Sequence, residues 1–227
     1  QDFTMVFNKN NGLLNHYVFQ EHNLLKKPLH LDFWRIPTSN DKGNKMHERL
    51  AVWNNITSKQ NLIDFKIEKT EEGSFKISTE SEIEGYKSVL KTEYLVYGNG
   101  YIHVNFNIEI KDDKLPEIPR LGFNLTVPSH FEHMTWYGRG PQENYWDRKS
   151  GAHINIYSGL VKDQYVPYIV PQENANKTDV RWASFKNIVS NQNFRLKSLF
   201  LIINKCEMNI QAEKMELVKM LLDTENP

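Results

Sequence analysis

The chain has 227 residues, of which 39% are hydrophobic and 12% aromatic, and we expect one large domain over residues 1–227 with a core of its own. Its 28 basic and 28 acidic side chains cancel, so no net field favours nucleic acid or an anionic membrane as a partner, and a neutral ligand fits better. The single cysteine, Cys206, excludes an internal disulfide and a cysteine-rich zinc module.

Apolar residues alternate with polar ones in short runs along the chain, which is typical of half-buried strands. The clearest run is Tyr101 to Ile110, where five apolar side chains point one way and His103, Asn105, Asn107 and Glu109 point the other. Shorter runs lie at Phe3–Phe7, Phe65–Ile67, Phe75–Ile77, Val89–Val96, Phe123–Val127, Leu199–Ile203 and Met208–Ile210. Turn signals at 10–12, 71–73 and 98–100 separate them. The pattern predicts an all-β fold of antiparallel sheets packed face to face.

One segment favours a helix. Lys45 to Asn55 places Met46, Leu50 and Trp53 on one stripe.

Just before this helix, the sequence from Phe33 to Gly43 is typical of a strand end that runs through Pro37 into a turn. Asn40 and Asp41 in that turn could hold a ligand hydroxyl or a metal ion, but such side chains more often cap the turn itself.

The tetrapeptide Pro-Gln-Glu-Asn occurs twice, at 141–144 and at 171–174. The first copy lies in the glycine-rich segment 138–148, which we expect to be a loop between strands. In one interpretation this loop faces a sugar, with Trp136, Tyr145 or Trp146 stacking on the ring. In the other, Arg139 or Arg148 pairs with Glu143 or Asp147 and pins the loop, and this second interpretation is the one that we favour.

The second copy lies in Tyr165 to Asn174, a stretch whose prolines and tyrosines suit either a pocket wall or a core corner. From the two copies we take candidate carbohydrate-binding residues, namely Arg139, Glu143, Asn144, Tyr145, Asp147, Arg148, Gln172 and Glu173.

Two carboxylates at working distance would make a glycosidase, but spacing along the sequence does not show that any pair lies at that distance. The eight histidines contain no His-Glu-x-x-His pattern, so we expect no metal site.

Three segments together resemble a known family. Leu31 to Gly43 resembles the "Asn-Phe-Trp-Arg-Ala-Pro-Thr-Asp-Asn-Asp-x-Gly" signature that opens the C-terminal domain, or small chain, of bacterial β-galactosidases of glycoside hydrolase family 2. Tyr137 to Arg148 resembles that domain's "Gly-x-Gly-Pro-x-Glu-Asn-Tyr-x-Asp-Arg" segment, and Tyr165 to Asn174 its "Tyr-x-x-Pro-Gln-Glu-x-Gly" segment. The three occur in the family's order.

The resemblance implies a large antiparallel β-sandwich, a supersandwich of the galactose mutarotase-like type. It also implies that the catalytic glutamates lie on a barrel domain elsewhere in the parent enzyme, so that no residue of this chain is catalytic. The family implies Mg²⁺ and Na⁺ sites in other domains, a galactoside substrate, the rest of the β-galactosidase chain as a partner, and homo-oligomeric assembly of the parent. The compartment, cytoplasm or periplasm of a bacterium, stays open.

The sequence departs from the family pattern at two of these positions. Ser39 replaces an aspartate, and Ala175 stands where glycine is common. The chain begins at Gln1 and stops at Pro227, about where the family's glycine-rich loop with its pocket tryptophan would begin. We therefore expect both ends to be cut from a longer polypeptide and that tryptophan to lie outside this sequence.

A different class of function uses the same sandwich type. A stand-alone carbohydrate-binding module would bind galactosides without hydrolysing them. An aldose 1-epimerase would need a general acid and a base that converge on the anomeric carbon, typically a histidine and a glutamate. His103, His130, His133 and His153 are candidates by residue type alone.

Overall fold

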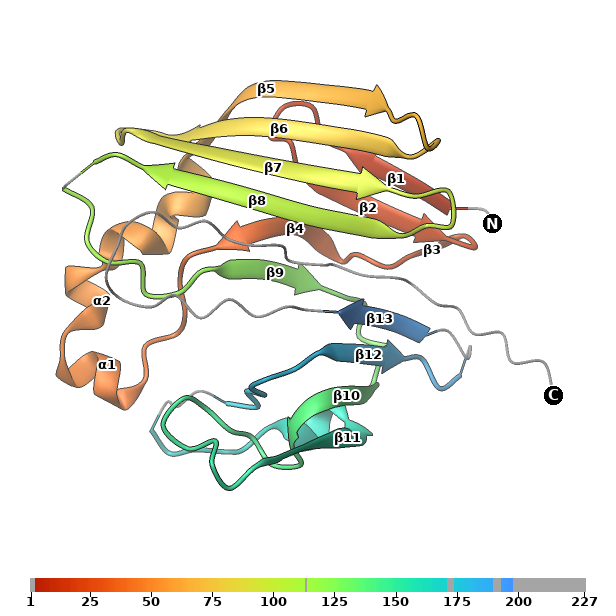
Figure 1. The fold of residues 1–227 in the computed structure, drawn as a ribbon. Helices are drawn as coiled ribbons and strands as arrows, with labels where there is room; N and C mark the ends of the chain where they lie inside the picture. Colours follow the sequence, from red (N-terminus) through yellow and green to blue (C-terminus); the bar gives the residue numbers. More distant parts are fainter. Residues whose placement is uncertain (1–2, 113, 171–173, 190–192, 198–227) are drawn as a thin grey trace. The chain divides into compact units, whose positions relative to one another are not determined.

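The computed structural model describes residues 3–112, 114–170, 174–189 and 193–197. These residues divide into two compact units, which we call the N-terminal unit (within 3–128) and the C-terminal unit (within 129–197). Both are built from antiparallel sheets, as Figure 1 shows, so the all-β prediction is confirmed. The single-domain expectation stays a prediction, and each unit is described by itself.

The N-terminal unit contains two sheets. The first has the order β1-β2-β4-β9 with β3 beside β2, and its strands are β1 (Phe3–Phe7), β2 (Leu14–Phe19), β3 (His22–Asn23), β4 (Lys27–Asp32) and β9 (Gly122–Thr126). The second is an antiparallel meander of β5 (Gln60–Lys69), β6 (Phe75–Ile83), β7 (Ser88–Val96) and β8 (Ile102–Ile110). Turns between strands fall where the sequence predicted them, and Gly12, Gly73 and Gly100 adopt positive φ there.

Aromatic contacts join the two sheets of this unit into a sandwich. The ring centroids of Phe7 and Tyr94 lie 5.0 Å apart, and those of Phe106 and Phe123 lie 5.2 Å apart. Along β8 the apolar residues from Ile102 to Ile108 are buried, whereas His103, Asn105 and Asn107 are only partly so. The period-two pattern predicted this strand because one of its faces packs against the other sheet.

The predicted helix at 45–55 is present but broken. It consists of α2 (Met46–Arg49), which follows α1 (Ser39–Gly43), and of the 3₁₀ helix η1 (Ala51–Lys59). Met46, Leu50 and Trp53 are all buried, as the stripe predicted. The break falls at Leu50, whose φ of −110° and ψ of 13° depart from helical values. The asparagines and β-branched residues that follow are poor α-helix formers.

The C-terminal unit holds one four-stranded sheet of order β11-β10-β12-β13. Its elements are β10 (His133–Gly140), β11 (His153–Leu160), η2 (Val161–Gln164), β12 (Trp182–Lys186) and β13 (Asn193–Lys197). The runs predicted at 199–203 and 208–210 lie outside the described residues. In the part that the structure describes, no helix combines the length and the apolar composition that crossing a bilayer needs.

Our assignment of 138–148 to a loop is wrong at its start, because residues 138–140 belong to β10. A Cβ at Gly138 would lie 2.8 Å from the Val180 Cα, and one at Gly140 would lie 2.7 Å from the Tyr157 ring. Here the glycines serve close packing inside a sheet, and the loop itself begins at Pro141.

Candidate functional site

The candidate site lies in the C-terminal unit, where the loop after β10 meets the segment that leads into β12. The Gly140–Pro141 peptide bond, which is cis, starts this loop. The backbone N–H of Asn144 donates to the Asn176 carbonyl at 2.9 Å, and the Asn176 side-chain amide donates back to the Asn144 carbonyl at 2.8 Å. The first tetrapeptide is thus bonded to residues that directly follow the second one.

Asn144 is the centre of the site. Its side chain is completely buried. The amide nitrogen donates to the carbonyls of Arg139 (3.3 Å) and Gln142 (3.1 Å), while Oδ1 accepts from the Thr178 backbone N–H (2.9 Å) and hydroxyl (2.5 Å). The full bonding capacity of the amide is used inside the protein. Asn144 therefore has no polar atom to offer a ligand.

Glu143 joins three parts of the unit through one carboxylate. Its Oε1 forms an ion pair with the Arg148 guanidinium at 2.8 Å and accepts from the Tyr168 hydroxyl. Its Oε2 accepts from the Ala175 backbone N–H at 2.9 Å. Only 8% of the Glu143 side chain is exposed, so these charge-assisted bonds are largely shielded from water. The Glu143–Arg148 pair that we predicted is confirmed.

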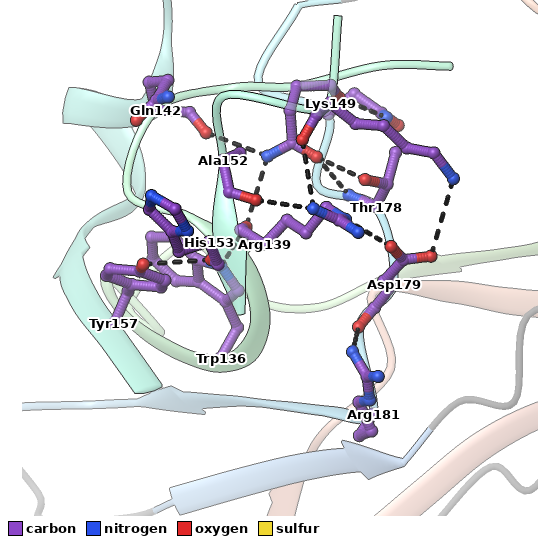
Figure 2. Close-up of polar contacts among 12 residues, drawn as sticks. Trp136, Arg139, Gln142, Lys149, Ala152, His153, Tyr157, Thr178, Asp179 and Arg181 are labelled. Carbon is purple, nitrogen blue, oxygen red and sulfur yellow. Dashed lines mark hydrogen bonds and ion pairs between the residues drawn. The ribbon is translucent and has the colours of Figure 1, made fainter. Parts of the chain in front are cut away.

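Arg139 does not join that pair. As Figure 2 shows, its guanidinium donates to Asp179 and to the carbonyls of Ala152 (2.7 Å) and Lys149 (3.2 Å). The predicted partners, Glu143 and Asp147, were therefore wrong for Arg139. The bond from Arg139 holds the pKa of the Asp179 carboxyl below its usual range, and the nearby Lys149 ammonium acts in the same direction.

Lys177 is a buried cation in the same unit. Its ammonium donates to the Pro141 carbonyl at 3.1 Å and lies 4.8 Å from the centroid of the Trp136 ring. Burial lowers the pKa of Lys177, an effect that the Glu143 charge opposes. Trp136 is buried too, and its indole N–H donates to the Arg139 carbonyl at 3.0 Å (Figure 2).

Comparison with known proteins decides the family. The family profile described as "Beta galactosidase small chain" matches residues 1–219. The chain belongs to the β-galactosidase small-chain family. It is similar to a β-galactosidase of Priestia megaterium, with 37% identity over 82% of this chain, and to those of Lactobacillus delbrueckii subsp. bulgaricus (32% over 80%) and Halalkalibacterium halodurans (28% over 80%). The match spans about 18% of the length of each of these relatives.

The remaining candidate residues of this small-chain domain differ in their exposure to solvent. Tyr145 is partly exposed, and Asp147 and Trp146 are exposed, with the Lys149 ammonium 4.9 Å from the Trp146 ring. Trp136 cannot stack on a sugar because only 1% of it is exposed, so that part of our interpretation was wrong. Gln172 and Glu173 lie outside the described residues. Binding of a sugar by the other candidates stays a prediction.

The second tetrapeptide ends in an asparagine that closes its own loop. The Asn174 side chain accepts from the Val166 N–H at 2.9 Å and donates to the Val166 carbonyl at 2.6 Å. Ala175 follows with a φ of 59°, a left-handed conformation that favours glycine, the residue common at this position in the family pattern.

The turn at Asn40 and Asp41 has a structural role in the N-terminal unit. Asp41 completes a capping box with Thr38 at the start of α1 and pairs with Arg35 at 2.7 Å. The prediction that this side chain caps the turn is thus confirmed. Across the described residues, no group of three or more His, Cys, Asp or Glu side chains is placed to hold a metal ion.

Sequence reasoning missed Asn176, Lys177, Thr178 and Asp179, which bond to Asn144, Pro141 and Arg139. The available signal was the polar run from Asn174 to Asp179, placed directly after the second tetrapeptide. Chemically, the arrangement holds backbone in place. The side-chain amide of Asn144 and both carboxylate oxygens of Glu143 are already bonded to the protein.

Proposed function

We propose that this chain is the small-chain domain of a β-galactosidase that hydrolyses terminal non-reducing β-D-galactosides. In that enzyme it acts as a structural domain that borders the substrate pocket. The catalytic glutamates lie on a barrel domain elsewhere in the parent chain, and the 227 residues alone are inactive. The observation that carries the proposal is the family match over residues 1–219, together with the similarity to β-galactosidases that are about five times as long as this chain.

The geometry of the C-terminal unit supports a structural role. A catalytic acid or nucleophile must reach the substrate, but the Glu143 carboxylate is only 8% exposed and is bonded to Arg148, Tyr168 and Ala175. Asn144 is likewise consumed by four internal bonds. The bonds of Glu143 and Asn144 fix the conformation of the loop. This supports a role in stabilising the border of the substrate pocket.

The epimerase alternative gains no support from the histidines of the C-terminal sheet. His133 lies opposite Leu160 and His153 lies opposite Gly140, at the two ends of the β10–β11 pair. An epimerase needs an acid and a base that converge on one carbon atom. These two histidines therefore do not converge on one carbon atom.

The proposal is tested by expressing the full-length gene product and the 227-residue chain separately and assaying both with a chromogenic β-galactoside. We expect hydrolysis by the full-length protein and none above buffer by the 227-residue chain. Hydrolysis by the short chain would overturn the claim that it is inactive alone. A folded full-length protein without activity on any β-galactoside would overturn the assignment to an active enzyme.

A further inference from the structure

One segment of the C-terminal unit presents apolar side chains to solvent. It runs from Tyr165 to Val170, and we call it the apolar segment. Ile169 is fully exposed, Tyr165 is 65% exposed and Val170 is 47% exposed. The six residues Tyr-Val-Pro-Tyr-Ile-Val contain no charged side chain. Single exposed apolar residues are ordinary on protein surfaces, whereas a contiguous exposed group marks an interaction site.

The apolar segment is held in place from the protein side. Its Tyr168 hydroxyl donates to Glu143 and accepts from the Arg148 guanidinium at 3.2 Å. Both backbone polar groups of Val166 are bonded to the Asn174 side chain, and the Tyr168 N–H donates to the Val166 carbonyl at 2.8 Å. A surface that is fixed before binding loses little conformational entropy on binding. The bonds around Glu143 thus hold a ready-made contact surface.

The size of the relatives indicates what could cover this surface. The matched region is about 18% of the β-galactosidases to which the chain is similar, so most of such an enzyme lies outside these residues. Exposed apolar patches mark surfaces that pack against another protein surface, and in a chain of several domains a neighbouring domain offers one. An uncharged, apolar segment suits an apolar surface of a neighbouring domain, and its lack of charge disfavours an acidic or basic partner.

We infer that the apolar segment is a docking surface for the part of the parent β-galactosidase outside residues 1–227, with Ile169 as its central contact. The inference rests on the proposed function, because that function supplies the parent chain. In this account Glu143, Arg148 and Asn174 are positioning residues that set the angle at which Ile169 meets the neighbouring domain.

The test measures the accessibility of position 169 in the full-length parent. Ile169→Cys and a matched control, Val189→Cys, are labelled with a thiol reagent under native conditions and in urea, and the label at each site is followed by peptide mass spectrometry. Val189 is also an exposed apolar residue of the C-terminal unit, at 92%. We expect the I169C thiol to react about tenfold or more slowly in the native protein than in urea, and the V189C thiol to react at similar rates in both. Rapid native labelling of the I169C thiol would overturn the inference.

A bifunctional cross-linker on the I169C thiol identifies what covers it. Cross-links to peptides outside residues 1–227 support docking to the rest of the parent, whereas cross-links only to residues 1–128 would overturn it. Galactoside hydrolysis by the wild-type parent is measured in parallel. If the parent is inactive the proposed function fails, yet labelling and cross-linking still decide whether the apolar segment is a docking surface.

Discussion

The most informative perturbation is Asn144→Ala. The substitution leaves the Thr178 backbone N–H, the Thr178 hydroxyl and the Gln142 carbonyl without their partner, in a region where Asn144 itself is fully buried. The Arg139 carbonyl keeps the indole N–H of Trp136 as a donor. Three newly unsatisfied groups at about 1–3 kcal/mol each predict a loss of at least about 3 kcal/mol in the free energy of unfolding.

Urea denaturation of the 227-residue chain measures this loss. With a slope of about 2 kcal/mol/M, the urea midpoint should fall by at least about 1.5 M while the slope itself stays unchanged. Gln142→Ala is the control in the same loop, because Gln142 is exposed and its amide makes only a 3.5 Å contact with the Gly151 carbonyl. This substitution should change the free energy of unfolding by less than about 0.5 kcal/mol. A loss below about 1 kcal/mol for N144A would refute the reasoning.

Three further predictions concern residues around this loop. Asp179→Asn should lower stability by about 1 kcal/mol at pH 7. Because the folded pKa of Asp179 is lowered, its contribution to stability is present above about pH 3.9 and is lost as the pH falls through the folded pKa. The melting temperatures of wild type and D179N should therefore converge below about pH 4. A constant gap between them would contradict the pairing with Arg139. Ala175→Gly should raise the free energy of unfolding by about 0.5–1 kcal/mol in urea denaturation, because it relieves the strain of an alanine in the left-handed conformation. The control Ala183→Gly in β12 should lower it by a similar amount. Destabilisation by A175G would argue against backbone strain at this position. Calorimetric titration of the 227-residue chain with galactose should show millimolar binding at best, about 4 kcal/mol, since the side chains of Asn144 and Glu143 are already bonded within the protein. Micromolar affinity would show that a sugar site exists.

The strands that sequence predicted best are those with one polar and one apolar face. Ile102 to Ile110 alternates because β8 packs on one side only, and its period is visible without a structure. In β10, by contrast, Trp136, Gly138 and Gly140 share a face on which glycines make room for Val180 and Tyr157. Such packing carries no hydrophobic period, and the glycines were therefore taken for a loop.

The partners within the candidate site were predictable only where they are close in sequence. Glu143 and Arg148 are five residues apart, and their pairing could be foreseen from opposite charge on one loop. Arg139 pairs with Asp179, forty residues further on, and Asn144 binds Thr178 at a separation of thirty-four. The cross-strand pairing of β10 with β12 brings these distant residues together, and no local pattern reports it.

The central claim is that the first Pro-Gln-Glu-Asn loop braces the fold and does not carry out the chemistry. Glu143→Gln in the full-length parent tests it most directly, since the amide keeps the size of the side chain and removes its charge. The change breaks the ion pair with Arg148 and turns an N–H group toward one of the donors that now face the carboxylate, at a cost of about 1–3 kcal/mol. We predict a lower melting temperature with kcat within a few-fold of wild type, whereas unchanged stability with a fall in kcat of about a thousandfold or more would contradict the account.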